Sequence, residues 1–196
     1  MSFGGRQLDT IRFRKAQSSD AAAIGAVHVA SWRETYIGLL PAQLLNDLSA
    51  EARSTMWSTI INDPASSGGT VVFVATIADE IVGFGACGGQ RDDALKERGF
   101  DSEVGAIYVL RSHQHAGVGS TLMNLMARKL LGQGRKATTL WVLRENAPAR
   151  RFYERLGGAL VGEKADEQWG EKLSEVAYGW SDLLKLARER SRHVES

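Results

Sequence analysis

The chain has 196 residues, of which 43% are hydrophobic and 24% are charged, as expected for one well-packed globular domain. Its formal net charge of +1 argues against a broad basic surface for nucleic acid, and no apolar run approaches the ~20 residues that cross a membrane. Cys87 is the single cysteine, so we expect neither an internal disulfide nor a multi-thiolate metal site, and a reducing cytoplasm fits. We interpret Cys87 as a small core residue.

In the first half of the chain, alternating apolar and polar residues predict strands, and apolar residues at helical spacing predict helices. The expected elements are a strand at 10–15, a helix capped within Ser18-Ser19-Asp20, a short helix from Pro41, a helix at 50–62, and a hairpin of strands 71–77 and 81–87 turning at Asp79-Glu80. Residues 91–100 are highly charged and predict an exposed loop or helical turn.

The second half is expected to hold a strand at 103–110, a helix at 117–132, a strand at 138–143, a helix at 147–156, and strands at 159–166 and 173–180. Hairpins together with one βαβ crossover predict an α/β (α+β) fold, in which one mixed sheet carries helices on both faces. We expect a single domain over residues 1–185. The charged residues 186–196 are expected to form a frayed tail.

The most informative stretch is Gln114-His115-Ala116-Gly117-Val118-Gly119, which joins the predicted strand at 103–110 to the helix at 117–132. A strand that leads through such a turn into a helix makes an anion site, because unpaired N–H groups and the helix dipole point out of the helix N-terminus. Glycines at 117 and 119 let the backbone approach a phosphate closely. The pattern predicts a phosphorylated cofactor bound by main-chain amides of residues 115–120.

A second block lies about thirty residues further on and reads as a strand, a turn and a short helix closed by glycines. The turn contains Asn146 and Pro148, and the glycines are Gly157 and Gly158. We expect Phe152 to face the core and Tyr153, about 100° further round the helix, to face a cleft.

Together the two blocks resemble the GCN5-related N-acetyltransferase (GNAT) superfamily, whose members transfer an acetyl group from acetyl-CoA to amines. Its phosphate pattern, Gln/Arg-x-x-Gly-x-Gly/Ala, is matched by Gln114, Gly117 and Gly119. Its later pattern is matched by Asn146, Ala149, Phe152, Tyr153 and Gly157. The resemblance implies a mostly antiparallel, twisted sheet that splays between the fourth and fifth strands, with a bulge in the strand at 103–110.

The resemblance also implies acetyl-CoA (CoA) as the cofactor. Backbone groups near Ile107, Tyr108 and Val109 would bind the pantetheine like an added strand, and the Val109 N–H would face the thioester carbonyl, where negative charge develops. The full set of implied cofactor residues is Ile107, Tyr108, Val109, Gln114, His115, Ala116, Gly117, Val118, Gly119, Ser120, Asn146, Ala149, Phe152 and Tyr153.

One departure from the family pattern concerns the phosphate loop. His115-Ala116 stand where many members carry Gly-Arg or Gly-Lys, so one basic phosphate contact is missing. His115 or Arg111 is a candidate substitute, and a plain exposed side chain is the alternative. Modest cofactor affinity is the expected consequence.

Tyr153 resembles the general acid of the family, since a phenol with a pKa of about 10 can protonate a departing thiolate. The alternative is an aromatic ring that only packs. Glu103 lies eleven positions before Gln114, where the histone-acetylating branch has its catalytic glutamate, and is the expected base. Glu34 and Asp101 are alternatives for the base, whereas His28 is expected in the core or in a cleft wall.

The resemblance implies that the first two helices and the hairpin at 159–180 surround the acceptor. The predicted acceptor residues are Trp32, Glu34 and Tyr36, whose aromatic and acidic side chains suit a cationic amine. Trp57 and Trp169 are further aromatic candidates. The expected partner is a small-molecule or peptide amine, and neither nucleic acid nor a membrane is expected. Related proteins are often dimers, so a homodimer is one expected arrangement. The alternative function is a CoA-binding sensor or accessory module with the same fold and little turnover.

Overall fold

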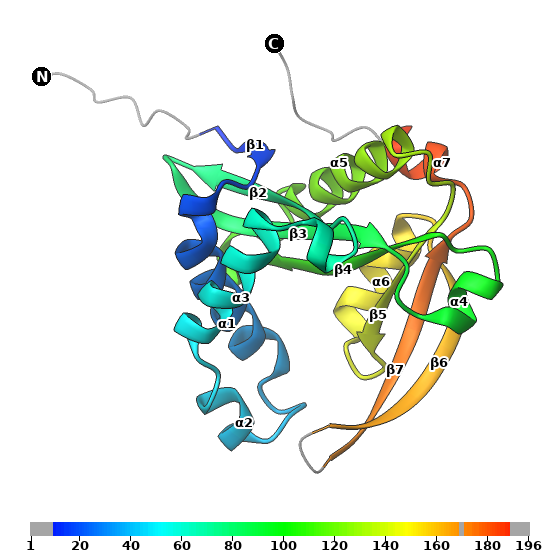
Figure 1. Ribbon diagram of the computed structural model, residues 1–196. Coiled ribbons are helices and arrows are strands. Elements are labelled where there is room, and N and C mark those ends of the chain that lie inside the picture. The colour runs from blue at the N-terminus through cyan, green and yellow to red at the C-terminus, as the bar shows by residue number, and fades with distance from the viewer. Residues whose placement is uncertain (1–9, 169–170, 189–196) are drawn as a thin grey trace, which may run out of the picture.

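The computed structural model describes residues 10–168 and 171–188 of the chain (Figure 1). In chain order its strands and helices are β1 (Arg12–Lys15), α1 (Ala21–Tyr36), α2 (Ala42–Asn46), α3 (Ala50–Asn62), β2 (Val71–Ile77), β3 (Glu80–Gly89), α4 (Asp93–Glu97), β4 (Ser102–Val109), α5 (Val118–Gly132), β5 (Thr138–Leu143), α6 (Ala147–Arg155), β6 (Ala159–Gln168), β7 (Glu171–Trp180) and α7 (Leu183–Arg188). The predicted strands and helices are confirmed in type and order.

The strands form one seven-stranded sheet in the order β1-β2-β3-β4-β5-β7-β6. Every neighbouring pair is antiparallel except β4 and β5, which are parallel. A parallel pair needs a crossover, and α5 supplies it between β4 and β5. The predicted mixed, mostly antiparallel sheet is therefore confirmed.

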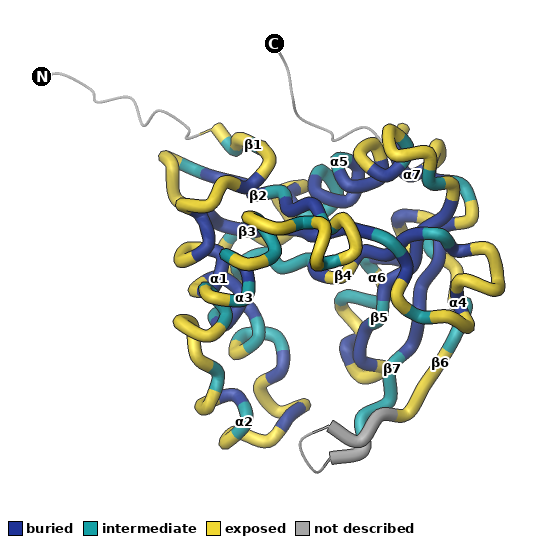
Figure 2. Tube along the Cα trace, viewed as in Figure 1, coloured by how far each residue is buried: buried dark blue, intermediate teal, exposed yellow. Residues whose placement is uncertain are grey.

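Helices cover both faces of the sheet (Figure 1). On one face α1 and α3 pack against β2 and β3 through a core cluster that includes Ile24, Trp57 and Phe84. On the other face α5, α6 and α7 pack against the sheet through a second cluster, which contains Met126 and Leu183. Figure 2 shows the buried positions concentrated along the strands and on the inner sides of these helices.

Cys87 lies in the second of these clusters, on β3, and is 1% exposed. Burial raises the pKa of its thiol to about 12, so the thiolate that a nucleophile needs does not form near neutral pH. The interpretation of Cys87 as a core residue is confirmed.

The β2–β3 hairpin turns one residue earlier than expected. Ala78 and Asp79 occupy the turn with φ angles of 47° and 67°, and Glu80 already begins β3. A two-residue hairpin turn with both φ angles positive matches the twist of the strands. The sequence did not locate this turn because such positions usually carry glycine or asparagine, and Ala78 is neither.

Of the two expectations for residues 91–100, an exposed loop or a helical turn, the helical turn is confirmed. These residues contain α4, whose first turn is capped by the Asp92 side chain accepting from Leu95 N at 3.1 Å. Leu95 and Phe100 are buried, so they anchor this charged segment to the sheet. The sequence analysis did not predict that Leu95 and Phe100 are buried, because charged residues surround them in the sequence.

The C-terminal helix α7 packs on α5, where the Asn124 amide donates to Ala187 O at 2.6 Å. Leu186 and Ala187 are buried. The predicted boundary between domain and tail at residue 185 therefore lies inside α7. Residues 189–196 of the predicted tail, and residues 1–9, lie outside the described residues.

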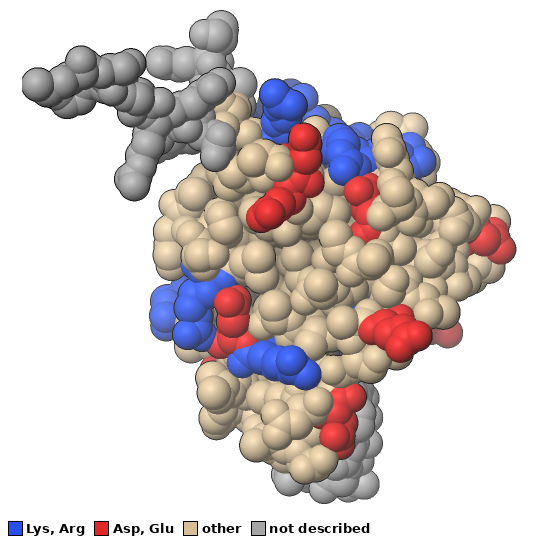
Figure 3. All heavy atoms as spheres, turned by 90° about the vertical axis from the view of Figure 1, so that its left-hand side faces the viewer, with Lys and Arg blue, Asp and Glu red and all other residues tan. Residues whose placement is uncertain are grey.

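None of the described helices has the length and hydropathy that a membrane crossing requires. Within the same residues, no group of three or more His, Cys, Asp or Glu side chains is placed to hold a metal ion. On the face drawn in Figure 3, basic and acidic side chains are interspersed rather than gathered by sign.

Candidate functional site

The sheet opens between β4 and β5. These strands pair only through Ser102 with Thr138 and Glu103 with Thr139, at their N-terminal ends. Beyond Glu103, β4 continues beside β3 alone. The register with β3 places Ala106 opposite Ala86 and Val104 opposite Cys87, so Gly105 is an extra residue that forms a bulge. The expected splay and bulge are both confirmed.

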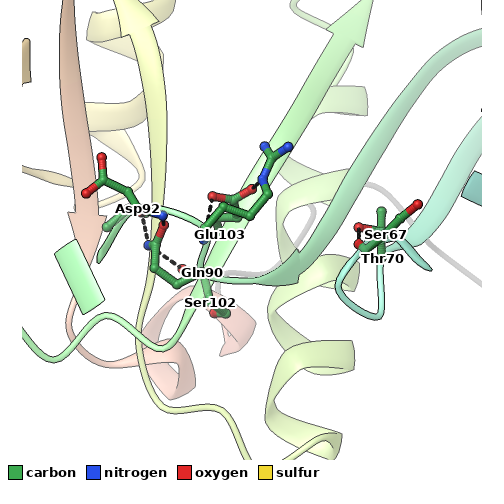
Figure 4. Close-up of polar contacts among 8 residues, drawn as sticks. Ser67, Thr70, Gln90, Asp92, Ser102 and Glu103 are labelled. Atoms are coloured by element: carbon green, nitrogen blue, oxygen red, sulfur yellow. Dashed lines mark hydrogen bonds and ion pairs between the residues drawn. The ribbon is translucent and has the colours of Figure 1, made fainter. Parts of the chain in front are cut away.

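The closed end of the splay is tied together by Gln90, which is 6% exposed (Figure 4). Its amide nitrogen donates to Ser102 O on β4 at 3.2 Å and to Thr139 Oγ1 on β5 at 2.7 Å. One buried side chain thus joins the two strands where their own pairing ends. It holds the point from which they diverge.

The open edge of β4 presents main-chain groups to the splay. In an antiparallel pair, successive residues direct their N–H and C=O groups alternately toward and away from the partner strand. Leu110 N donates to Val82 O of β3 at 3.0 Å, so the main chain of Val109 faces away from β3. The Val109 carbonyl on this edge accepts a hydrogen bond from the Gln114 amide at 3.0 Å. Gln114 therefore fixes the end of β4.

The N-terminus of α5 is an exposed loop-to-helix junction. Residues 114–117 are exposed, His115 and Gly117 have φ angles of 63° and 82°, and the helix begins at Val118. The N-cap residue Gly117 makes no side-chain cap hydrogen bond, whereas the N-cap residues Ser49 and Asn146 cap α3 and α6. A Cβ atom at Gly117 would have no neighbour within 4 Å. These features fit an anion held by the main-chain amides.

The other residues of this segment have distinct surroundings. Val118 is a core residue with 1% exposure, and Ser120 is partly buried in the first turn of α5. A Cβ atom at Gly119 would lie 3.0 Å from the ring of Phe152. A larger residue at position 119 would press on the Phe152 ring, so the glycine favours close packing of α5 against α6, a reason that the sequence pattern did not reveal.

α6 places Asn146 and Tyr153 at the open side of the splay. Asn146 Oδ1 caps the helix by accepting from Ala149 N at 3.2 Å, and its side chain hydrogen-bonds Tyr36. Tyr153 lines a small cavity of about 60 Å³ together with Asn146, Ile107 and Tyr108. Burial raises the pKa of Tyr153 well above its usual value, so its hydroxyl stays protonated at neutral pH.

A larger cavity of about 190 Å³ shares several walls with the small one. It is lined by Trp32, Tyr36, Leu40, Arg91, Glu103, Val104, Gly105, Tyr108, Leu140, Trp141, Val142, Leu143, Leu173 and Glu175. The structure thus places the predicted residues Glu103, Trp32 and Tyr36 around one cavity, next to the cavity of Tyr153.

Glu103, which is labelled in Figure 4, is 8% exposed, and Arg91 binds its carboxylate. Its Oε2 accepts from the Arg91 main-chain N at 3.3 Å, and its Oε1 forms an ion pair with Arg91 Nε. The Arg91 side chain is largely exposed. The carboxylate is therefore held in one orientation against the cavity wall beside the Gly105 bulge.

Other predicted residues lie elsewhere. Glu34 is absent from the cavity lining, and its carboxylate accepts from Arg111 N at 2.8 Å. The side chain of Asp101 accepts from the main-chain N of Lys136 and Ala137. Trp57 is a core residue, and Trp169 lies outside the described residues.

Among the lining residues that the sequence reasoning did not select, three have charged or aromatic side chains: Arg91, Trp141 and Glu175. A signal for Glu175 was available, because Leu173 and Glu175 are two positions apart on a predicted strand and therefore point to the same face. Trp141 is likewise inside a predicted strand. Nothing local in the sequence shows that these faces turn toward a cavity.

His28 lies behind the cavity wall in an aromatic cluster. It accepts from Trp57 Nε1 at 3.1 Å through Nδ1, and its ring stacks on Tyr108 with centroids 4.8 Å apart. Burial, assisted by the charge of Arg53, lowers the pKa of His28 from 6.5 to about 4. His28 is therefore a neutral wall residue that supports Tyr108.

The pKa of His28 predicts a pH dependence of stability. The unfolded chain binds a proton at this residue below its ordinary pKa, whereas the folded chain does so only below about 4. The free energy of unfolding should therefore decrease as the pH falls from about 6.5 to about 4, by up to ~3 kcal/mol from this group. Urea unfolding across this interval measures it.

The matched comparison uses two variants. His28→Gln should flatten the decrease in that pH interval, because the titrating group is gone. His113→Gln changes a histidine of the loop before α5 and should leave the wild-type pH dependence intact. Equal pH dependence in the wild type and His28→Gln would contradict the prediction.

Comparison with known proteins finds N-acetyltransferases both by sequence and by structure. The family described as "Acetyltransferase (GNAT) family" matches residues 20–158. A Bacillus subtilis protein named "Uncharacterized N-acetyltransferase YuaI" is 35% identical over 179 residues, which cover 90% of this chain and 96% of the relative.

Two solved structures illustrate the likeness in fold. The PaiA N-acetyltransferase from Thermoplasma acidophilum, crystallised with coenzyme A, has a TM-score of 0.66 at 19% identity, covering 85% of this chain and 98% of that chain. YncA of Salmonella typhimurium, described as "a putative acetyltransferase" and solved with acetyl-CoA, has a TM-score of 0.64 at 18% identity, covering 88% of this chain and 94% of that chain.

Proposed function

The chain belongs to the acetyltransferase (GNAT) family, and from this premise we propose that it moves an acetyl group from acetyl-CoA to a primary amine of a small molecule or peptide by direct attack. It is an acyltransferase, and acetyl-CoA is its cofactor. The observation that carries the proposal is that three features occur together at the splay between β4 and β5. The edge of β4 beyond Glu103 is not paired with β5, the N-terminus of α5 follows the end of β4, and Tyr153 lines a cavity together with residues of β4.

The residues present fit this cofactor. Main-chain amides of residues 115–120 would hold the diphosphate at the start of α5, since the N-cap residue Gly117 makes no side-chain cap hydrogen bond. The edge of β4 from Ile107 to Val109 would hold the pantetheine as an added strand, because β5 leaves that edge unpaired. When bound, the cofactor supplies the acetyl group as a thioester, whose leaving group is a thiolate.

Tyr153 is the proposed proton donor to the thiolate. Its buried hydroxyl, with a raised pKa, keeps its proton at the pH at which the enzyme works. The Val109 main-chain N–H, on the side of β4 away from β3, is the proposed hydrogen-bond donor to the acetyl carbonyl oxygen. Both groups belong to elements that border the splay.

Glu103 is the proposed acceptor of the proton that the amine must lose. Its carboxylate lies on the wall of the larger cavity, and Arg91 holds its orientation. This cavity adjoins the one lined by Tyr153, so an amine within it would lie next to the proposed proton donor.

Two measurements test the function. Calorimetric titration of the folded protein with coenzyme A should show saturable binding, and a panel of primary amines with acetyl-CoA should include members that release free thiol. Saturable binding without thiol release on a broad panel would instead favour a CoA-binding module. An absence of any coenzyme A binding would contradict both functions.

The proposed base predicts the behaviour of Glu103→Gln. Turnover should fall about 10-fold to 100-fold, and the acidic limb of the pH–rate profile should shift, because the amide cannot take up a proton. Glu97→Gln on the exposed end of α4 is the matched control and should retain wild-type kinetics. An unmoved acidic limb in Glu103→Gln would assign proton removal to another group.

A further inference from the structure

The acceptor cavity has a second carboxylate, Glu175, on the face of the sheet formed by β5, β7 and β6. The strand register places Glu175 opposite Leu143 on β5 and opposite Lys164 on β6. Trp141, two residues from Leu143, points to the same face. Trp141, Leu143 and Glu175 all line the cavity of about 190 Å³.

The two carboxylates of this cavity differ in how they are held. Glu103 receives two hydrogen bonds from Arg91, one of them from the rigid main chain. Glu175 is paired with Lys164, whose side chain is 40% exposed on the outermost strand of the sheet. An exposed lysine loses little by moving into water, because a surface ion pair contributes little stability. The partner of Glu175 is therefore exchangeable.

The position of Lys164 shows what this wall binds. Its ammonium lies 3.2 Å from Glu175 Oε2 and 4.4 Å from the ring centroid of Trp141. A carboxylate beside an aromatic face attracts an alkylammonium group through both charge and the ring quadrupole. The side chain of Lys164 is itself a primary alkylammonium, so the chain carries a chemical equivalent of an amine substrate at its own cavity wall.

We propose that Glu175 and Trp141 are specificity-determining residues that bind the protonated amine of the acceptor, and that Lys164 occupies this position until the acceptor displaces it. This inference rests on the proposed function, which makes the cavity the acceptor site. The substrate class is a primary alkylammonium whose apolar stem lies along Trp32 and Tyr36, the aromatic side chains on the opposite wall.

Binding of butylammonium tests the proposal without any turnover. The readout is the NMR signal of the Trp141 indole N–H, assigned with Trp141→Phe, and 1-butanol is the uncharged comparison. Lys164→Met, which removes the internal ammonium, should bind butylammonium about fivefold more tightly than the wild type. Glu175→Gln should bind it at least about tenfold more weakly.

The control variants separate the site from general charge effects. Lys164→Arg keeps a cation at the wall and should bind butylammonium like the wild type. Glu163→Gln removes a carboxylate from the neighbouring position on β6, which pairs with Arg144, and should have no effect. 1-Butanol should bind weakly and equally to all variants.

Three results would overturn the proposal: equal butylammonium affinity in the wild type, Lys164→Met and Glu175→Gln; equal affinity for butylammonium and 1-butanol; or no saturable binding even in Lys164→Met. Calorimetry with coenzyme A on the same samples keeps the two hypotheses apart. Normal coenzyme A binding with any of these results rejects the ammonium site alone, whereas loss of coenzyme A binding in the wild type rejects the proposed function.

Discussion

Gly117→Glu is expected to abolish coenzyme A binding, with a loss of about 100-fold or more in affinity. Gly117 is the N-cap residue of α5, and it makes no side-chain hydrogen bond that would cap the helix. A carboxylate here would take the place of the diphosphate at the helix N-terminus and repel it. Calorimetric titration with coenzyme A measures the effect.

Backbone strain must be separated from this charge effect, because Gly117 has a φ angle of 82°. Gly134, after the C-terminal end of the same helix, has a φ angle of 79° and equally open space around its Cβ position. Gly134→Glu should therefore lose a similar ~1–2 kcal/mol of stability, yet keep its coenzyme A affinity. Unchanged affinity in Gly117→Glu would remove this loop from the cofactor site.

Tyr153→Phe is expected to lower turnover about 100-fold while leaving the affinity for acetyl-CoA nearly unchanged. The phenyl ring keeps the packing of Tyr153 against Tyr178 and Trp180, so only the hydroxyl proton is lost. Steady-state kinetics with an amine identified from the panel gives turnover, and calorimetry gives affinity.

Tyr178→Phe is the matched control for this change. The Tyr178 hydroxyl donates to Glu154 and accepts from Arg150, and the residue lines neither cavity. Its loss should reduce stability without a comparable fall in turnover. Wild-type turnover in Tyr153→Phe would show that Tyr153 only packs, and the thiolate would then leave without this donor.

The stretch at 114–119 illustrates how far a local pattern reaches. The turn and the helix start that follows it depend on residues within a few positions of one another, so the sequence predicted them. The close contact at Gly119 comes from Phe152, which is distant in sequence, so the local pattern did not reveal it. Gln114 was predicted as a cofactor residue, which stays a prediction, and in the structure its amide binds the Val109 carbonyl.

For the wall of the larger cavity, the local sequence pattern was not sufficient. Trp32 and Tyr36 were placed at the cavity by resemblance, whereas Glu34, only two residues from each of them, turns toward Arg111. On a helix, residues two positions apart point about 200° from each other, so a run of candidates cannot all face one cavity. Trp141 and Glu175 were identified as lining residues only from the β5–β7 register, which places their side chains on the same face of the sheet.

Local spacing and hydrophobic period were enough to predict the order and type of the elements, the loop before α5 and the position of Tyr153 on α6, and the resemblance of two motifs indicated the family. Tertiary structure alone decided where β4 leaves β5, which carboxylates reach the cavity, and that Lys164 lies against Trp141 and Glu175. Such features depend on one extra residue at Gly105 and on strand register, through which side chains far apart in the chain become neighbours.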